Sequence, residues 1–392
     1  MRILHVLSER GYSGGEDQLA HLLEHLAARG HESIVVLNPG ALFAQTCQRL
    51  GLVVHEVRMR NDADLVAILR LRSLFKSTNP DLIHLACSRG HKLGALADVT
   101  SKRGPPKIVT RRMDYPIGAS ALRRWLYGSA VDAVVAISEG VRREVLAVGV
   151  AAQRVHCVHD GIDVGRFKGL RQGEQREQVR RELGVVDDTL IGLTTASLHR
   201  RKGQDVLLEA LARLPDTGPR LLWLFAGDGP ERSALEQRAA ALGLLGTALS
   251  RRVEARFLGA VRPVDGLLAA SDLFCLPSRR EGLGVALLEA MAAGLAVVAT
   301  AIGGMVEAVQ DGVSGLLVPV EDVAALARAL ERLDDPELRA RLGSAAEARA
   351  ERDFGLERMC EQSEAIYLAV ASERPSAAAA RRRVQQGRPD GR

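Results

Sequence analysis

Short apolar runs with strand character alternate with helical stretches from the first residues onward. In the first half of the chain the strand-like runs lie at 2–8, 33–38, 52–57, 81–86, 107–110 and 133–138. A helical stretch at 16–29 lies between the first two runs and ends before Gly30. This alternation predicts βαβ units and therefore a parallel sheet with helices packed on it.

A polar, charged segment at 169–186 carries no strand signal, and the same rhythm restarts after it. Strand-like runs follow at 189–197, 220–227, 254–260, 272–278, 296–300 and 314–319. We therefore predict an α/β protein with two Rossmann-like, parallel-sheet domains, residues 1–168 and 187–352, joined by a linker at 169–186.

Residues 320–370 are predicted to be helical throughout, and the last part, 353–371, keeps apolar residues at helical spacing. A helix with an apolar face needs a surface to pack against, and we expect this one to cross back to the first domain. Residues 372–392 lack an apolar face and are predicted to be a disordered basic tail.

Length and composition suit this architecture. A chain of 392 residues fits two domains, and with 47% hydrophobic but only 3% aromatic residues its core must consist of leucine, valine, alanine and isoleucine. The apolar run at the amino end is too short for a signal peptide or a membrane span, so we expect a cytoplasmic protein. The five cysteines are far apart and odd in number, which fits neither a disulfide framework nor a zinc site and predicts core thiols.

Charge is divided unevenly along the chain: residues 1–168 carry a net +7, residues 169–371 a net −6 and residues 372–392 a net +4. Either this is a compositional accident, because net charge reports weakly on fold, or the first half faces anionic acceptors or a lipid surface. The stretch GASALRRWLYG (118–128) suits the second interpretation, since arginines beside aromatic rings can lie among lipid headgroups. Alternatively, its aromatic residues pack beneath the sheet.

The most informative segment is residues 271–300, SDLFCLPSRREGLGVALLEAMAAGLAVVAT, in which a buried strand ends at Pro277 and a helix begins near Gly284. The free amide groups of a first helical turn and the helix dipole favour an anion at such a position. The amides concerned belong to Gly284, Val285 and Ala286. Because Gly282 and Gly284 would let a ligand approach the backbone closely, we expect a phosphate site here.

Glu281 and Glu289 lie on either side of this turn. If the span between them were helical throughout, their carboxylates would be roughly 12 Å apart, too far to share a metal ion or a proton. They should therefore bind different parts of one extended ligand. Glu281 could instead only stabilise the helix amino end. Glu289 lies in the apolar run ALLEAMAAG, where an unpaired carboxylate is costly and a pair of ligand hydroxyls would satisfy it.

Lys202 lies in a basic loop between a strand that ends near Ser197 and a helix that follows Gly203. If this loop and the predicted phosphate site lie at the carboxyl ends of one parallel sheet, the lysine can neutralise a diphosphate without a metal. Taken alone, a basic loop is usually a solvated loop.

Gly14 and Gly15 also lie between a strand and a helix, a weak signal by itself. If the two sheets face each other across a cleft, this glycine turn would approach the phosphates from the opposite side.

Two further patterns have structural explanations. Asp62 and Asp64 resemble a metal-binding aspartate pair, but they stand at the start of a helical pattern, which favours helix capping. His5, His84 and His156 lie in apolar strands without metal-ligand spacing, which is typical of core imidazoles. We therefore expect neither a metal ion nor another cofactor.

In their order along the chain, these motifs resemble the retaining glycosyltransferases of the GT-B fold, family 4 type, which build lipopolysaccharide, capsule, exopolysaccharide and phosphoinositol mannosides. Glu281 to Glu289 is similar to the E-x7-E signature of that family. Supporting pieces are DGIDVGRF (160–167), FAGDGPER (225–232), FLGAV (257–261) and the pair Gly14–Gly15. The resemblance covers nearly the whole chain and implies sugar transfer from a nucleotide-sugar donor to a glycan or glycolipid acceptor.

The resemblance further implies roles for single residues. Glu289 would bind the nucleotide ribose, Glu281 the transferred sugar and Lys202 the diphosphate, while Gly15 would close over the phosphates. The whole implied donor set is Gly15, Ser197, Arg201, Lys202, Gly282, Leu283, Gly284, Val285 and Glu289. Such enzymes retain the anomeric configuration, with the leaving diphosphate helping to deprotonate the acceptor, so no carboxylate nucleophile is required.

Two positions depart from the family pattern. The arginine expected five residues before Lys202 is Ser197, so that Arg201 or its neighbour would have to compensate. In the first domain a histidine is common near the segment TRRMDYP (110–116), where this chain has two arginines followed by Asp114. Asp114 is the catalytic candidate there, for orienting the acceptor.

Rival functions remain on the same fold. One is a non-catalytic nucleotide-sugar-binding protein, in which Ser197 in place of the usual arginine would reflect lost activity. Another is an epimerase that acts on the nucleotide sugar itself. A dehydrogenase is disfavoured because neither half has the dinucleotide fingerprint. We expect no nucleic-acid partner, whereas an anionic membrane surface, with peripheral attachment on its cytoplasmic side, is a partner that the charge of the first domain favours.

Overall fold

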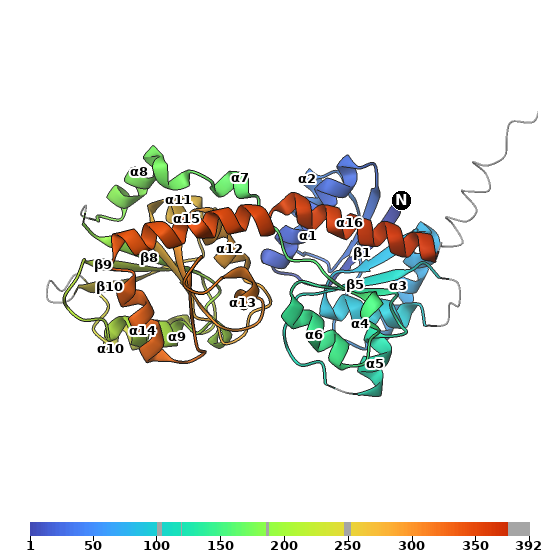
Figure 1. Ribbon diagram of the computed structural model, residues 1–392. Coiled ribbons are helices and arrows are strands. Elements are labelled where there is room, and N and C mark those ends of the chain that lie inside the picture. Colours follow the sequence, from blue (N-terminus) through green and yellow to red (C-terminus); the bar gives the residue numbers. More distant parts are fainter. Residues whose placement is uncertain (100–103, 119, 186–187, 247–251, 375–392) are drawn as a thin grey trace, which may run out of the picture. The chain divides into compact units, whose positions relative to one another are not determined.

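The computed structural model describes residues 1–99, 104–118, 120–185, 188–246 and 252–374 (Figure 1). The chain divides into two compact units, and one of them is discontinuous in sequence. The first unit consists of Met1–Gly161 and the chain from Leu356 onward, and the second is Ile162–Gly355.

The first unit is built on a seven-stranded sheet in the order β3-β2-β1-β4-β5-β6-β7, in which all neighbouring strands are parallel. The strands are β1 (Arg2–Leu7), β2 (Glu32–Leu37), β3 (Val53–Glu56), β4 (Leu82–Leu85), β5 (Lys107–Arg111), β6 (Ala133–Ala136) and β7 (Val155–Cys157). Strands such as LIHL and AVVA are buried along their whole length, as expected where helices cover both faces of a parallel sheet.

Helices pack on both faces of this sheet because alternate residues of each strand point to opposite sides. One face carries α3 (Leu65–Thr78), α4 (Ser88–Ala97), α5 (Ala121–Tyr127) and α6 (Glu139–Ala147). The other carries α1 (Gly14–Ala28), α2 (Phe43–Arg49) and the last helix, α16 (Leu356–Glu373). The apolar face of α16 thus returns the end of the chain to the first unit. From residue 375 onward, the predicted tail lies outside the described residues.

The second unit contains a six-stranded parallel sheet in the order β10-β9-β8-β11-β12-β13. Its strands are β8 (Leu190–Thr195), β9 (Leu221–Ala226), β10 (Val253–Gly259), β11 (Leu273–Leu276), β12 (Ala296–Thr300) and β13 (Leu316–Val318). Its helices are α7 (Val164–Phe167), α8 (Glu174–Glu182), α9 (Gln204–Ala212), α10 (Arg232–Ala241), α11 (Asp265–Ala270), α12 (Val285–Ala292), α13 (Met305–Ala308), α14 (Val323–Arg332) and α15 (Pro336–Asp353). The predicted α/β class with two parallel-sheet, Rossmann-like domains is confirmed.

The expected linker at 169–186 needs correction. Most of it is helical, in α8, and it belongs to the second unit, while the chain passes between the units at Gly161–Ile162. The helix has no apolar face, but Arg176 and Arg180 both bind the carboxylate of Asp272, at 2.6 and 3.2 Å. A helix held by polar contacts needs no hydrophobic periodicity, and for this reason α8 could not be predicted from the pattern of apolar residues.

All five cysteines lie in the described part of the chain and are free thiols. Cys47, Cys275 and Cys360 are buried, as expected for core thiols, whereas Cys87 and Cys157 are half-buried.

Candidate active site

The sheet of the second unit reverses its strand order between β8 and β11, which pair in parallel through Leu273 with Gly192 and Phe274 with Leu193. Ligands of open α/β sheets bind at the carboxyl ends of strands at such a reversal. The loop after β8 contains Lys202, and the loop after β11 contains Glu281. The two loops therefore lie at the carboxyl ends of strands of one parallel sheet, the arrangement in which Lys202 was expected to neutralise a diphosphate.

Lys202 and Glu281 form an ion pair, although 79 residues separate them in the sequence. Only 12% of each side chain is exposed. The hydroxyl of Ser278 donates a hydrogen bond to the same carboxylate oxygen at 3.2 Å. Glu281 is thus an acceptor held by two donors.

The two loops are also joined through Arg279. Its backbone amide donates to the carbonyl of Arg201 at 2.7 Å, and its guanidinium binds both carboxylate oxygens of Asp205 at 2.7 and 2.8 Å. These hydrogen bonds with Asp205 raise the pKa of Arg279 above its ordinary value. A planar, bidentate pair of this kind fixes geometry as well as charge, so the lysine and the glutamate are held on rigid loops.

Glycines make this close approach possible. Gly203 has φ +70°, and a Cβ atom there would lie 2.0 Å from the carbonyl oxygen of Pro277. Gly304 donates its amide to the carbonyl of Gly282 at 3.0 Å, and a Cβ atom on Gly304 would lie 2.3 Å from that oxygen. Larger residues at Gly203 or Gly304 would push the loops apart.

Two helices begin at this edge of the sheet with glycine as N-cap residue. Gly203 precedes α9 and Gly284, at φ +92°, precedes α12. Glycine has no side chain with which to cap first-turn amides, so the amino end of α12 favours an anion. In α9 the carboxylate of Asp205 already accepts hydrogen bonds from the amides of Asp205 and Val206. The helix begins at Val285, as predicted, but the span from Glu281 is a loop and not a helix, so the separation expected for a continuous helix does not apply.

Other donor candidates of the second unit lie on the same two loops and on α12. Leu283 is buried in the turn between the loop and α12, and the carbonyl of Ser197 accepts a hydrogen bond from Gln204 at 3.1 Å. Glu289 is half-buried on α12, whose neighbour is α7. Its charge helps to raise the pKa of Arg166 on α7, although the larger cause is the hydrogen bond from Arg166 to Asp265.

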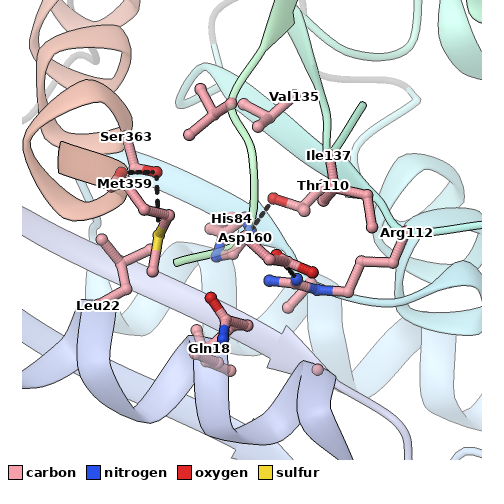
Figure 2. A pocket seen from close by; sticks show the side chains of 14 residues that line it. Gln18, Leu22, His84, Thr110, Arg112, Val135, Ile137, Asp160, Met359 and Ser363 are labelled. Atoms are coloured by element: carbon pink, nitrogen blue, oxygen red, sulfur yellow. Dashed lines mark hydrogen bonds and ion pairs between the residues drawn. The ribbon is translucent and has the colours of Figure 1, made fainter. Parts of the chain in front are cut away.

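The first unit has a pocket of its own, shown in Figure 2. It is lined by Gly15 and Gln18 of α1, by His84, Thr110 and Arg112 near the ends of β4 and β5, and by Asp160. Arg112 forms an ion pair with Asp160, whose side chain is 8% exposed. A Cβ atom on Gly15 would lie 3.3 Å from Cδ of Arg112, so the glycine gives the arginine room to reach the aspartate.

Sequence reasoning missed this cluster. Asp160 lies in the segment 160–167, which resembles the family, and Arg112 lies in the segment 110–116, which departs from it. The two residues are 48 positions apart, and no local pattern pairs them. The candidate predicted from the sequence, Asp114, is half-buried two residues beyond Arg112 and is not among the residues that line the pocket.

A chain of buried polar groups leads to the pocket. Nδ1 of His5 lies 3.0 Å from Nδ1 of His84, and Nε2 of His84 lies 2.9 Å from the Thr110 hydroxyl. Burial lowers the pKa of His5 to about 3 and that of His84 well below its ordinary value, so both rings are neutral near pH 7. They are core imidazoles, as predicted, and the pKa of the half-buried His156 is also lowered by burial.

Asp62 and Asp64 are not arranged as metal ligands. Asp64 is the N-cap of α3 and accepts the amide of Ala67 at 3.1 Å, which confirms the capping interpretation for this residue. Asp62 instead forms ion pairs with Lys92 and with Arg89.

Two family models match the chain, "Glycosyltransferase Family 4" over residues 12–166 and "Glycosyl transferases group 1" over residues 175–349. A GDP-mannose-dependent monoacylated alpha-(1-6)-phosphatidylinositol monomannoside mannosyltransferase of Corynebacterium glutamicum is 32% identical over 285 residues, which are 69% of this chain and 72% of that protein. This chain belongs to the group 1 glycosyltransferases.

Other relatives of this glycosyltransferase match nearly end to end. The lipopolysaccharide core biosynthesis glycosyltransferase LpsE of Rhizobium meliloti is 28% identical over 369 residues, 93% of this chain and 98% of LpsE. The crystal structure of Anabaena HepE in complex with UDP and glucose has a TM-score of 0.80 at 23% identity and covers 94% of this chain and 100% of that one. The fold is therefore shared along both units.

The helix considered for membrane contact from the sequence is α5 of this glycosyltransferase. Tyr127 is buried, with its ring against His91 and its hydroxyl accepting from Arg111 at 2.7 Å, and Trp125 packs against the core. The aromatic rings therefore pack against the core of the first unit, while Arg123 and Arg124 are exposed. Among the described residues, no helix is both long enough and apolar enough to span a membrane.

Proposed function

We propose that this glycosyltransferase moves a sugar from a nucleotide-sugar donor to a lipid-linked or cell-surface glycan precursor, with retention of the anomeric configuration and without a metal ion. The observation that carries the proposal is the Lys202–Glu281 ion pair, set between two helices that begin at glycines. A donor diphosphate that binds Lys202 and the first-turn amides of α12 replaces the carboxylate as partner of the ammonium group. Glu281 is then released to accept hydrogen bonds from hydroxyls of the transferred sugar.

The chemistry we propose needs no protein nucleophile. The acceptor hydroxyl attacks the anomeric carbon on the face from which the diphosphate leaves, and the new C–O bond forms as the bond to the diphosphate breaks. The departing diphosphate oxygen takes the proton of the acceptor hydroxyl. Lys202 and the helix amides stabilise the negative charge that develops on the diphosphate, the task that a divalent cation performs elsewhere.

The relatives support a nucleotide-sugar donor and a lipid-linked acceptor. The Corynebacterium glutamicum enzyme is named as GDP-mannose-dependent and as acting on a phosphatidylinositol monomannoside, LpsE is named for lipopolysaccharide core biosynthesis, and Anabaena HepE binds UDP-glucose in a crystal. An acceptor of this kind would bring the first unit to the cytoplasmic surface of an anionic membrane. For the acceptor side we propose Asp114 as the orienting carboxylate; Arg112, two residues before it, lines the pocket.

Donor identity is tested first by thermal shift with UDP-, GDP-, ADP- and CMP-sugars, since a ligand that binds only the native state raises its stability. The donor with the largest shift is then incubated with the enzyme in EDTA, and the sugar released by hydrolysis is followed by proton NMR. We expect turnover to persist in EDTA and the first anomer to have the configuration of the donor.

Each other outcome contradicts one part of the proposal. Loss of turnover in EDTA with rescue by magnesium or manganese would contradict metal independence, and an inverted first anomer would contradict retention. An altered sugar still attached to its nucleotide would favour the epimerase. Binding without hydrolysis, and without transfer to membrane lipid extracts, would favour the non-catalytic protein.

A further inference from the structure

One helix of the first unit carries large apolar side chains on its outer face. In α3 the buried residues Ala67, Leu71 and Phe75 pack on the sheet. On the opposite side of the helix, Leu65 is 73% exposed, Val66 58% and Leu69 65%. A surface helix of a globular protein normally presents polar residues there, so this face needs an explanation.

Exposed cations lie on α3 and in the loop before it. Arg58 and Arg60 are exposed in the loop that leads into α3, and Arg70 is exposed one turn after Val66. Lys92 of α4 is joined to the same loop by its ion pair with Asp62. The carboxylates nearby are already engaged, Asp62 with cations and Asp64 as the helix cap, so the rim of the apolar face is positively charged.

We infer that this surface, which we call the α3 face (Leu65, Val66 and Leu69 with Arg58, Arg60 and Arg70), docks on the anionic headgroups of a lipid bilayer. Leucine and valine side chains that enter the headgroup boundary, with arginines among the phosphates, are the chemistry of an interfacial helix. The inference rests on the proposed function, because a lipid-linked acceptor would require the enzyme at a bilayer. We therefore assign the membrane contact to the exposed leucines of α3 and not to the aromatic rings of α5, which pack in the core.

Other occupants fit the α3 face less well. Residues 375–392 of the chain carry five arginines and one aspartate, so their charge repels the cationic rim. A second copy of the chain would bring two such cationic rims together. An anionic bilayer is the partner whose charge complements the rim and whose interior takes up the apolar side chains.

The expected attachment is reversible. A few apolar side chains and a few cations give an affinity that salt weakens, because each cation near an anionic surface adds only a modest, screened attraction. Binding should therefore occur to vesicles that contain phosphatidylglycerol, fall with added salt, and be absent on phosphatidylcholine alone.

The test is co-sedimentation of the full-length protein with these two kinds of vesicle. We expect Leu65→Gln with Leu69→Gln to reduce binding to phosphatidylglycerol vesicles at least about tenfold, since two exposed leucines supply much of the apolar contact. The matched control is Leu368→Gln on α16, a leucine that is 45% exposed on the opposite side of the same sheet and should leave binding unchanged. Both substitutions replace exposed side chains, so thermal unfolding should remain that of the parent protein.

Several outcomes would overturn the α3 assignment. They are normal binding by the leucine variant, equal loss in the Leu368→Gln control, or loss caused instead by Arg123→Gln with Arg124→Gln on α5. Loss on neutralising Arg381, Arg382 and Arg383 would make the tail the anchor. A parent protein that is dimeric, and monomeric in the leucine variant, would make the α3 face an interface between copies.

Donor hydrolysis separates this inference from the proposed function. The leucine variant should hydrolyse the nucleotide sugar in solution at the rate of the parent protein. Hydrolysis without vesicle binding by the parent would refute the docking surface alone, whereas vesicle binding without any turnover would refute the proposed function alone.

Discussion

At the scale of single residues, the second unit is organised around a charge that is partly removed from water. Lys202 and Glu281 compensate each other at the edge of the sheet, and removal of either partner leaves an uncompensated charge in a site that is mostly shielded. This partly buried ion pair is also suited to bind a ligand, because a diphosphate can pair with Lys202 while ligand hydroxyl groups hydrogen-bond to Glu281.

Different effects are expected from the two glutamates. Glu281→Ala should reduce kcat by about 10–100-fold with little change in nucleotide affinity, because a charged hydrogen bond to the reacting sugar is worth about 1.5–3 kcal/mol. Glu289→Ala should mainly weaken nucleotide binding, by about tenfold. Steady-state kinetics with titration of the free nucleotide separates the two effects. Small and equal effects of both substitutions would mean that neither glutamate touches the donor.

Gly203 should resist substitution for reasons that can be measured apart from function. Gly203→Ala places a Cβ atom 2.0 Å from the Pro277 carbonyl oxygen at φ +70°, whereas Gly312→Ala has the same φ and no atom within 4 Å. The control should therefore lose only the backbone term, about 1–2 kcal/mol, and Gly203→Ala about 2 kcal/mol more from the collision. Chemical denaturation of both variants measures the difference, and equal losses would show that the loops can move apart freely.

At the scale of elements, the last helix is attached by a buried carboxylate as well as by apolar contacts. Glu364 of α16 is 6% exposed and accepts hydrogen bonds from His25 and His31, both at 2.9 Å. Burial favours the neutral acid, but the hydrogen bonds from His31 and His25, together with the charge of Arg29, outweigh it and hold the pKa of Glu364 below its ordinary value.

Glu364→Gln should destabilise the first unit by about 1–3 kcal/mol at neutral pH, since these hydrogen bonds are made to a charged acceptor. Because the pKa is lower in the folded state, the contribution is complete above the ordinary carboxyl range and is lost as the pH falls through the folded value. The difference in unfolding free energy between parent and variant should therefore shrink in acid. Glu361→Gln, an exposed position on the same helix, should change stability little. A gap between parent and Glu364→Gln that does not depend on pH would contradict this account.

At the scale of the whole molecule, the first unit is assembled from both ends of the chain. Met359, Cys360, Tyr367 and Val370 of α16 share an apolar cluster with Ile3 of β1 and Leu22 and Leu26 of α1. The second unit, by contrast, is one continuous segment, Ile162–Gly355. Folding of the first unit therefore needs residues that are synthesised after the whole second unit.

A chain that ends after Gly355 should keep the second unit and lose the first. Without α16 the apolar cluster is open to water, so amides of Met1–Gly161 should exchange hydrogen rapidly while those of Ile162–Gly355 stay protected. A chain that ends after Arg374 retains α16 and should exchange like the full-length protein. Slow exchange of the first unit in the shorter chain would show that α16 is dispensable.

Most helices and strands could be predicted because the local pattern of hydrophobic and polar residues indicates them. The runs at 2–8 and 133–138 contain β1 and β6, and the turn after Pro277 leads to a helix at Val285, as predicted. Helix α8 could not be read in this way, because arginine contacts with Asp272 and not an apolar face hold it in place. Of the candidate site, the loops with Lys202 and Glu281 could be predicted, because their glycines and charges are visible in the local sequence. The Arg112–Asp160 pair could not.

The sequence by itself determined the α/β class, the two parallel sheets and the loops that bear Lys202 and Glu281, because hydrophobic periodicity and helix-start residues act over short distances. Only the tertiary structure decided that β8 lies beside β11 and so joins these two residues, and that Arg112 meets Asp160. It alone decided which leucines of α3 remain exposed. The physical reason is that strand order and helix packing depend on contacts between distant segments, and no local pattern of hydrophobic and polar residues encodes which segments become neighbours.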